Sequence, residues 1–184
     1  MTKNVTVFLA DGFEEIEGLT VVDLLRRANI ETEMVSVMEG KQIKGSHGIK
    51  VTADNMFADV DFSDADVLVL PGGMPGTLNL ERSPIVTACA EYCARNNIYL
   101  AAICAAPSIL GHMGLLKEKE AICFPGFEGQ LNGARISEKH VCVDGNIITA
   151  KGMGVATQFG LVLAALMAGQ DEADHIHASI QCEA

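Results

Sequence analysis

The strongest restriction on the fold of this 184-residue chain is the alternation of short apolar runs with helical patterns along the sequence. Continuous apolar runs with β-branched residues are typical of strands that are buried on both faces. The predicted strands are 4–10, 31–37, 65–73 and 98–103. Apolar residues at helical spacing predict helices at 15–29, 83–97 and 155–169, and a helix of small residues that follows 98–103 through Leu110.

Alternating strands and helices of this kind predict an α/β domain with a mostly parallel sheet and helices on both faces. Two segments depart from the alternation. Residues 41–54 predict a hairpin-like excursion, and residues 140–150 predict a β-hairpin with Asp144 and Gly145 in its turn. We expect residues 1–184 to form one domain, in which the acidic tail 170–184 is only loosely held.

The composition is that of a globular protein and argues against several classes of partner. Hydrophobic residues make up 49% and charged residues 20% of the chain, and the net charge is -11. Nucleic acids and anionic membrane surfaces bind basic patches, so we expect neither as a partner. No run approaches the roughly 18 apolar residues of a membrane span. No targeting signal is visible either, so we expect a cytoplasmic protein with reduced cysteines.

Six cysteines are present, and two of them, Cys89 and Cys93, stand at helical spacing. Such a pair can supply half of a metal site, but no second pair of cysteines or histidines lies nearby with suitable spacing. His175 and His177 in the acidic tail are too few to make a site by themselves. We therefore expect no metal and no other cofactor.

Four distinctive loops follow the ends of predicted strands. ADGFEEIE follows the first strand, PGG follows VLVL, Cys104 follows IYLAAI, and KGMG follows NIITA. Ligands of open parallel sheets bind outside the carboxyl ends of the strands. We therefore expect these loops to meet at one edge of the sheet and to form the functional site there.

Cys104 stands where a predicted strand passes directly into a predicted helix. That geometry is similar to the nucleophile elbow, in which small residues two positions before and after the nucleophile let a tight turn close. Ala102 and Ala106 occupy these places, and Pro107 in the first helical turn costs no hydrogen bond. N–H groups at the helix start favour a thiolate, so we expect a lowered pKa for Cys104. The alternative is an inert cysteine packed in the core.

The glycines that follow VLVL suit a close approach of the backbone to a ligand. The N–H groups of Gly72 and Gly73, with that of Ala105, can form an oxyanion hole beside Cys104. The alternative is that the PGG segment only turns the chain.

Acidic residues open the first predicted helix, at Glu14, Glu15 and Glu17. Acid at a helix start complements the helix dipole and ordinarily lies in solvent. Glu17 differs because it lies near the carboxyl edge of the sheet and faces roughly toward the loop of Cys104. A buried carboxyl beside a thiolate is expected to be protonated, with a raised pKa. It can then donate a hydrogen bond to the sulfur or act as a general acid.

In their order and spacing, ADGFEEIE, VLPGG, AAICAAP and GMG resemble the motifs of the DJ-1/ThiJ/PfpI superfamily. The resemblance extends from Val5 to about Gly169 and favours the DJ-1 and ThiJ-like branch. The protease-like branch usually has His directly after the cysteine, where this chain has Ala105. We therefore do not expect a peptidase.

The resemblance implies a flavodoxin-like three-layer sandwich that assembles as a homodimer, with the first helix near the interface. It assigns the reactive cysteine to Cys104 and its protonated glutamate partner to Glu17. It assigns the oxyanion-binding N–H groups to Gly73, with Gly72, and to Ala105.

Two positions in the pocket depart from the pattern of the superfamily. Some members have a His-Pro dipeptide where this chain has Phe124-Pro125, and Met153 stands where Pro is frequent. We expect Phe124, Met153 and Glu14 to line the pocket. The ring of Phe124 cannot titrate, so a Cys-Glu mechanism is expected in place of a Cys-His mechanism. His47 is expected at the surface, with the alternative of reaching the pocket across a dimer.

The resemblance implies two functions that share the same cysteine. The first is enzymatic: cofactor-independent conversion of small 2-oxoaldehydes such as methylglyoxal, as a glyoxalase III-like lyase or a deglycase-type hydrolase. The second is a non-enzymatic role as an oxidative-stress sensor or redox-dependent chaperone, in which Cys104 is oxidised and Glu17 holds the product. The sequence does not separate these two functions.

Overall fold

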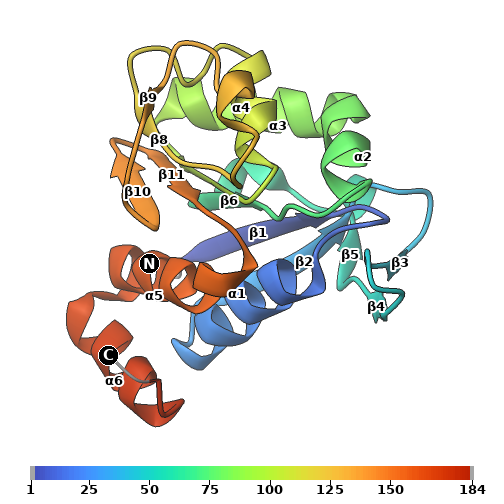
Figure 1. The fold of residues 1–184 in the computed structure, drawn as a ribbon. Coiled ribbons are helices and arrows are strands. Elements are labelled where there is room, and N and C mark those ends of the chain that lie inside the picture. Colours follow the sequence, from blue (N-terminus) through green and yellow to red (C-terminus); the bar gives the residue numbers. More distant parts are fainter. Residues whose placement is uncertain (1–2, 183–184) are drawn as a thin grey trace.

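The computed structural model describes residues 3–182 as a sheet of seven strands between two layers of helices (Figure 1). In spatial order the strands are β10 (Val141–Asp144), β11 (Ile147–Ala150), β7 (Tyr99–Ile103), β6 (Val67–Leu70), β1 (Asn4–Leu9), β2 (Glu31–Ser36) and β5 (Asn55–Met56). Neighbouring strands are parallel throughout, except that β10 and β11 form an antiparallel pair. The predicted mostly parallel α/β sheet is confirmed.

Helices cover both faces of this sheet (Figure 1). One layer contains α1 (Glu15–Arg27), α5 (Ala156–Ala168) and α6 (Gln170–Ser179). The other layer contains α2 (Gly76–Arg82), α3 (Pro84–Asn96) and α4 (Pro107–His112). Short 3-10 turns occur at Phe57–Asp59, Phe62–Asp64, Glu128–Gln130 and Met153–Val155.

The strands are buried on both faces because successive side chains point to opposite sides of the sheet. In β6, Val67 and Val69 join the hydrophobic cluster under α1 and α5, whereas Leu68 and Leu70 join the cluster under α3 and α4. All four side chains have no exposed surface. The continuous apolar runs of the sequence therefore correspond to two separate cores, one on each face.

Both predicted hairpins are present. The first consists of β3 (Gln42–Lys44) and β4 (Lys50–Thr52), and the second of β10 and β11. Elements that the sequence analysis did not predict are α2, β5, and the short parallel pair β8 (Glu120–Ala121) and β9 (Arg135–Ile136). The three strands have two residues each, too few to show a recognisable period.

The acidic tail is not loosely held, and this part of the prediction is wrong for the described residues. Residues 170–179 form α6, which packs against α5. Ala173 and Ile176 lie on the apolar side of α6, which faces the core, and they are 3% and 2% exposed. Residues 183–184 lie outside the described part of the chain.

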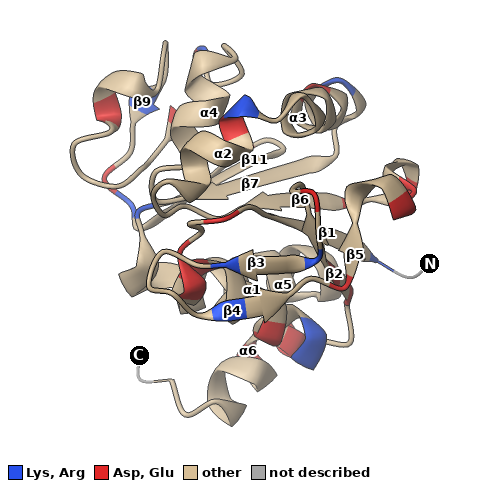
Figure 2. Cartoon of the chain, turned by 90° about the vertical axis from the view of Figure 1, so that its right-hand side faces the viewer, with Lys and Arg blue, Asp and Glu red and all other residues tan. Residues whose placement is uncertain are grey.

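The charged residues form no basic patch among residues 3–182 that would suit a nucleic acid. Acidic residues outnumber basic ones by 24 to 13, and the basic residues lie on separate elements that include β3, β4 and β9 (Figure 2). Among residues 3–182, none of the helices combines the length and the apolar character that crossing a bilayer requires.

Candidate active site

Cys104 lies at the turn between β7 and α4, where it adopts the left-handed backbone conformation with a φ of 65°. This conformation costs roughly 1–2 kcal/mol for a residue with a Cβ, so the surrounding fold must hold it. The Cys104 N–H donates to Ala150 O at 2.9 Å, and the Phe124 N–H donates to Cys104 O at 2.8 Å. The predicted tight turn from strand to helix is therefore present, and Cys104 is 7% exposed.

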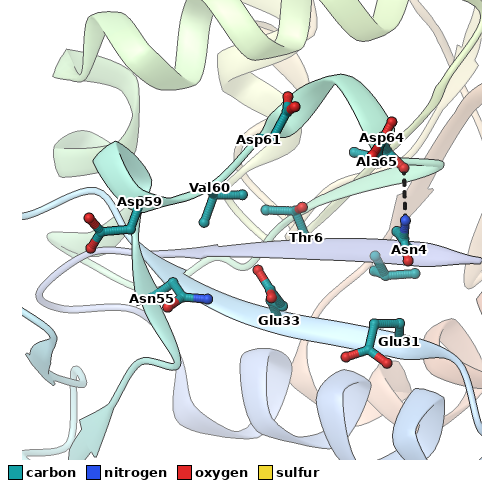
Figure 3. A pocket seen from close by; sticks show the side chains of 11 residues that line it. Asn4, Thr6, Glu31, Glu33, Asn55, Asp59, Val60, Asp61, Asp64 and Ala65 are labelled. Atoms are coloured by element: carbon teal, nitrogen blue, oxygen red, sulfur yellow. Dashed lines mark hydrogen bonds between the residues drawn. The ribbon is translucent and has the colours of Figure 1, made fainter.

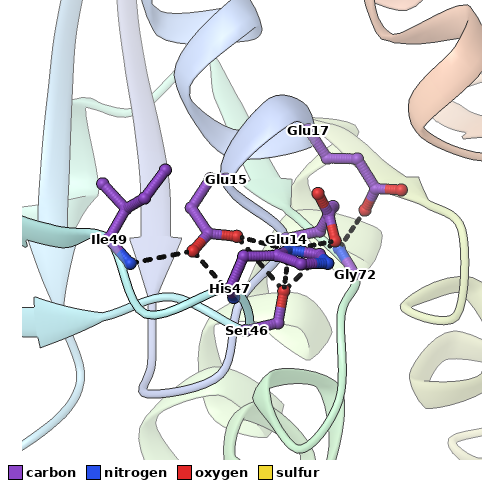
Figure 4. A network of polar contacts seen from close by, with 7 residues as sticks. All are labelled: Glu14, Glu15, Glu17, Ser46, His47, Ile49 and Gly72. Carbon is purple, nitrogen blue, oxygen red and sulfur yellow. Dashed lines mark hydrogen bonds and ion pairs between the residues drawn. The ribbon is translucent and has the colours of Figure 1, made fainter.

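Glu17 lies in the first turn of α1 with no exposed surface. The Gly72 N–H donates to Glu17 Oε2 at 2.9 Å (Figure 4). A Cβ added to Gly72 would stand 2.7 Å from both Cys104 Cβ and Glu17 Oε2, so this glycine lies between the two side chains. Oε1 of Glu17 has no hydrogen-bond partner among residues 3–182. Only a residue without a side chain therefore lets the thiol and the carboxyl group approach each other.

Burial raises the pKa of Glu17 to about 7. Hydrogen bonds with Cys104 and Gly72 oppose this shift, and the negative charge of Glu14 adds to it. The predicted direction is therefore confirmed. The nearby charge that contributes is the carboxylate of Glu14 and not a thiolate.

The pKa of Cys104 is raised to about 12, first by burial and then by the charge and the hydrogen bond of Glu17. The N–H groups of Ala105 and Gly73 oppose this shift but do not outweigh it. The prediction of a lowered pKa for Cys104 is therefore wrong. The prediction considered the N–H donors near the sulfur, which are visible in the sequence. It did not consider that the thiol is buried beside a carboxylate.

Cys104 and Glu17 consequently behave as one coupled acid. Burial raises the pKa of both groups, and the charge of Glu17 raises that of Cys104 further, so the pair keeps a proton at neutral pH. Around neutral pH the remaining proton belongs to the pair and can sit on sulfur or on oxygen. A nucleophile that shares its proton with an adjacent carboxylate can be deprotonated as it attacks.

The three predicted oxyanion donors do not have the same role. The N–H groups of Gly73 and Ala105 both donate toward the sulfur of Cys104. The N–H of Gly72 instead binds the carboxyl group of Glu17. Two of the three predicted N–H groups are therefore directed at the sulfur of Cys104, and the third at the carboxyl group of Glu17.

Phe124 and Met153 line a surface cavity of about 230 Å³. Its other lining residues are Pro125, His140, Lys151, Gly152, Gly154 and Val155. A Cβ at Gly152 would stand 3.1 Å from the ring of Phe124 and 4.0 Å from Cys104 Sγ. The cavity and the sulfur of Cys104 therefore meet at Gly152, the first residue of the quoted GMG motif, to which the sequence analysis gave no role of its own.

Glu14 does not line this cavity. It lies with Glu15, Ser46 and His47 in a polar network at the start of α1 (Figure 4). His47 contacts the two carboxylates of its own chain, and its side chain is 68% exposed, so it lies at the surface as predicted. The network itself is a feature that sequence reasoning missed. Residues 14 and 47 are too far apart in the sequence to reveal it.

A second cavity, of about 240 Å³, lies near the amino ends of β1 and β2 (Figure 3). Its acidic lining residues are Glu31, Glu33, Asp59, Asp61 and Asp64. The lining contains no thiol and no imidazole. Cys104 lies at the carboxyl end of β7, as the sequence predicts, and not in this second cavity.

Comparison with known proteins identifies relatives that share this fold. A family model described as the DJ-1/PfpI family matches residues 3–166. The protein dj-1beta of Drosophila melanogaster is 34% identical over 178 residues, which cover 96% of this chain and 95% of that protein. Oxidized DJ-1 of Toxoplasma gondii has a TM-score of 0.94 and 32% identity over 98% of each chain. A mutant DJ-1 superfamily protein from Salmonella typhimurium has a TM-score of 0.95 and 30% identity over 100% of each chain.

Proposed function

Because this chain belongs to the DJ-1/PfpI family, we propose that it converts small 2-oxoaldehydes to 2-hydroxy acids at the Cys104–Glu17 pair, without a cofactor. The observation that carries the proposal is the approach of a buried carboxyl group to the cysteine of a left-handed turn, across Gly72. A nucleophile and a proton carrier in contact are the two groups that this reaction requires.

The first step is the attack of Cys104 Sγ on the aldehyde carbon. A C–S bond forms, and the thiol proton passes to the carboxylate of Glu17. The carbonyl oxygen becomes an oxyanion near the N–H groups of Gly73 and Ala105, which already point toward the sulfur. Transfer of a proton to that oxygen gives a neutral hemithioacetal and returns Glu17 to its carboxylate form.

The second step moves a hydrogen between the two carbons of the substrate. The carboxylate of Glu17 removes the proton from the former aldehyde carbon, which leaves an enediolate. The same proton is then delivered to the neighbouring carbon while the hydroxyl proton passes from one substrate oxygen to the other, and the product is a thioester of a 2-hydroxy acid. A carboxyl group with a pKa of about 7 suits both directions of this transfer at neutral pH.

Water completes the reaction by attacking the thioester carbonyl. The C–S bond breaks, the sulfur recovers a proton, and the hydroxy acid leaves. The sum is one oxoaldehyde and one water in and one hydroxy acid out, so no external oxidant or reductant is needed. Oxidation of the aldehyde carbon balances reduction of its neighbour.

Lactate formation from methylglyoxal tests this proposal. Cys104→Ser is expected to abolish the activity, whereas Cys182→Ser, a cysteine in the C-terminal segment, is expected to retain it. If purified parent protein forms no lactate, or if Cys104→Ser forms it at the parent rate, the proposed reaction is refuted.

The second candidate function is redox sensing through oxidation of Cys104. The related Toxoplasma gondii protein has been solved in an oxidized form. In this chain the N–H groups of Gly73 and Ala105 and a protonated Glu17 would hydrogen-bond the oxygens of a sulfinate. Peroxide treatment followed by intact mass measurement should then add two oxygens to the parent and none to Cys104→Ser. An unchanged parent mass would remove this candidate.

We also propose that the chain forms a homodimer through the region where α1 begins. Two large apolar residues are exposed there. Ile16, which follows Glu15 in α1, is 53% exposed, and Ile49, whose N–H donates to the Glu15 carboxylate, is 54% exposed. Light scattering should give twice the chain mass for the parent and a smaller mass for Ile16→Asp. A monomeric parent would contradict the proposal.

A further inference from the structure

The cavity near the amino ends of β1 and β2 lies where one face of the sheet changes from apolar to polar. Alternate side chains of a strand share a face, and the two parallel strands pair Thr6 with Glu33 and Phe8 with Val35. Phe8 and Val35 belong to the core under α3 and α4. Two residues nearer the amino ends, the same face presents a hydroxyl and a carboxylate to the cavity.

The segment between β5 and β6 covers this part of the sheet and is anchored there. The rings of Phe57 and Phe62 pack against the ring of Phe8, with centroid distances of 5.9 Å and 5.8 Å. Closer to β6, Asn4 Nδ2 donates to Asp64 O at 3.2 Å (Figure 3). The cavity of about 240 Å³ therefore lies between a sheet and a cover that is tied to it by aromatic and polar contacts.

Thr6 is a buried polar residue without a polar partner in the fold. It is 5% exposed, and Figure 3 shows its side chain among those that line the cavity. Within residues 3–182 its hydroxyl takes part in no hydrogen bond, whereas the neighbouring positions of β1 are the apolar Val5 and Val7. Burying a hydroxyl without a hydrogen bond costs free energy. The hydroxyl of Thr6 therefore points to a polar ligand in the cavity.

The carboxylates around the cavity also have no cationic partner in the part of the chain that the structure describes. Within residues 3–182, no ion pair with lysine, arginine or histidine involves the acidic lining residues Glu31, Glu33, Asp59, Asp61 and Asp64. Lys3 and Arg26 pair instead with Asp66 and Asp54, which do not line the cavity. The negative charge of the lining is therefore left for a cationic ligand.

The spacing of these carboxylates suits an extended cation better than a metal ion. Among the described residues, no three of them bring oxygens within 4.8 Å of one another, as shared ligands of one ion would be. The apolar side chain of Val60 stands between Asp59 and Asp61 in the lining. Ammonium groups joined by methylene groups match this alternation of charged and apolar surface. The volume of about 240 Å³ is below the roughly 300–1,000 Å³ of drug-sized sites, so it suits a small ligand.

We propose that this cavity binds a linear aliphatic polyamine. Its ammonium groups pair with Glu33 and with the acidic residues of the segment between β5 and β6, and one N–H donates to the hydroxyl of Thr6. Its methylene groups lie against Val60. The proposed homodimer uses the beginning of α1, at the carboxyl edge of the sheet, whereas this cavity is at the amino edge. The binding does not depend on Cys104 or on the proposed reaction.

Calorimetric titration of the whole chain with spermidine tests the proposal, at about 0.15 M salt, where charges more than ~8 Å apart are largely screened. We expect one saturable site per chain. Thr6→Val removes the hydroxyl with little change in volume and should weaken binding by about tenfold. Glu33→Gln should weaken it by more than about tenfold, because hydrogen bonds to charged groups are stronger. The matched control is Glu39→Gln, which removes an exposed carboxylate outside the cavity and should leave the affinity unchanged.

Three results would overturn the proposal. The first is the absence of saturable binding, or unchanged affinity in both Thr6→Val and Glu33→Gln. The second is equal weakening in Glu33→Gln and Glu39→Gln, which would mean diffuse attraction to the net charge of -11. The third is displacement of spermidine by an equal concentration of Mg²⁺, which would assign the cavity to a metal ion. Circular dichroism verifies that each variant is folded, and Thr6→Val leaves the net charge unchanged.

Discussion

Glu15 and Glu17 stand two residues apart in the first turn of α1, and both are buried. Their pKa values are nevertheless shifted in opposite directions from the ordinary value of a glutamate. The pKa of Glu15 is lowered to about 2, although burial alone would raise it, because backbone N–H groups and His47 hydrogen-bond the carboxylate. Burial raises the pKa of Glu17 to about 7, since its hydrogen bonds with Gly72 and Cys104 are too few to compensate.

This contrast shows that burial raises the pKa of an acidic residue in this turn unless enough hydrogen-bond donors compensate for it. Glu15 faces the hairpin loop, which supplies two backbone N–H groups and an imidazole. Glu17 faces Gly72 and Cys104, and one of its oxygens has no partner among residues 3–182. One helical turn therefore contains both a permanent anion and a carboxyl group that can exchange a proton near neutral pH.

The largest expected effect comes from removing the exchangeable proton. Glu17→Gln keeps the shape of the side chain but cannot carry a proton, so methylglyoxal turnover should fall by roughly 10²–10⁴-fold. Lactate assays at saturating substrate measure this loss. Glu81→Gln, on α2, serves as the control and should retain the parent rate. A Glu17→Gln protein with the full rate would show that Glu17 is not the proton carrier.

The next effect is on stability. Because the pKa of Glu17 is raised from 4.5 to about 7 on folding, its contribution is fully present below pH 4.5 and is lost as the pH rises through about 7. Glu17→Gln has no such loss, so its stability relative to the parent should improve by about 3 kcal/mol between these limits. Urea unfolding at pH 4.5 and pH 8 measures the difference. An unchanged difference between the two proteins would mean that Glu17 is ionised like an ordinary carboxyl group.

Glu15→Gln should show the opposite dependence on pH. A carboxyl group whose pKa is lowered to about 2 contributes stability that is present above pH 4.5 and is lost as the pH falls through about 2. The parent should therefore exceed the variant by about 2 kcal/mol at pH 6, a value reduced for solvent near the exposed His47, and by less at pH 2.5. Urea unfolding at these two pH values provides the test. Equal differences at both would contradict the account of the hydrogen-bonded anion.

The smallest effect should follow from disturbing the donors of Glu15 without changing its charge. In Gly45→Ala the new Cβ would collide with the Glu15 carboxylate, and the side chain can yield only in part. We expect a loss of about 1 kcal/mol in unfolding free energy, at the low end for overpacking. Gly40→Ala is the control, because a Cβ there meets nothing within 4 Å. Equal stability of the two variants would show that Glu15 does not need its present position.

The parts of this site that lie within one stretch of sequence could be predicted. Small residues at positions 102 and 106 and the direct passage from strand to helix indicate the turn at Cys104, and the structure gives it a φ of 65°. The placement of Glu17 at the same edge follows from the parallel sheet, in which the carboxyl ends of the strands meet. The order of the main elements follows from hydrophobic periods, although the strand predicted at 65–73 is shorter, Val67–Leu70.

The parts that depend on contacts between distant segments could not be predicted. The sequence shows only that Gly72 has a backbone N–H. The fold shows that this N–H binds Glu17, 55 residues away in the sequence. The meeting of His47 with Glu15 depends likewise on how the hairpin folds back. The predicted direction of the Cys104 pKa shift was wrong because it depends on burial and on the carboxylate of Glu17, which are tertiary features. The neighbouring N–H groups, in contrast, are local in the sequence.

The central claim is that Cys104 and Glu17 share one exchangeable proton near neutral pH. The most direct measurement is the rate of Cys104 alkylation by iodoacetamide as a function of pH, in the parent and in Glu17→Gln, with Cys104→Ser as background. The account predicts a rise near pH 7 in the parent, as Glu17 becomes able to accept the thiol proton, and loss of that rise in Glu17→Gln. Identical pH profiles for the two proteins would contradict it.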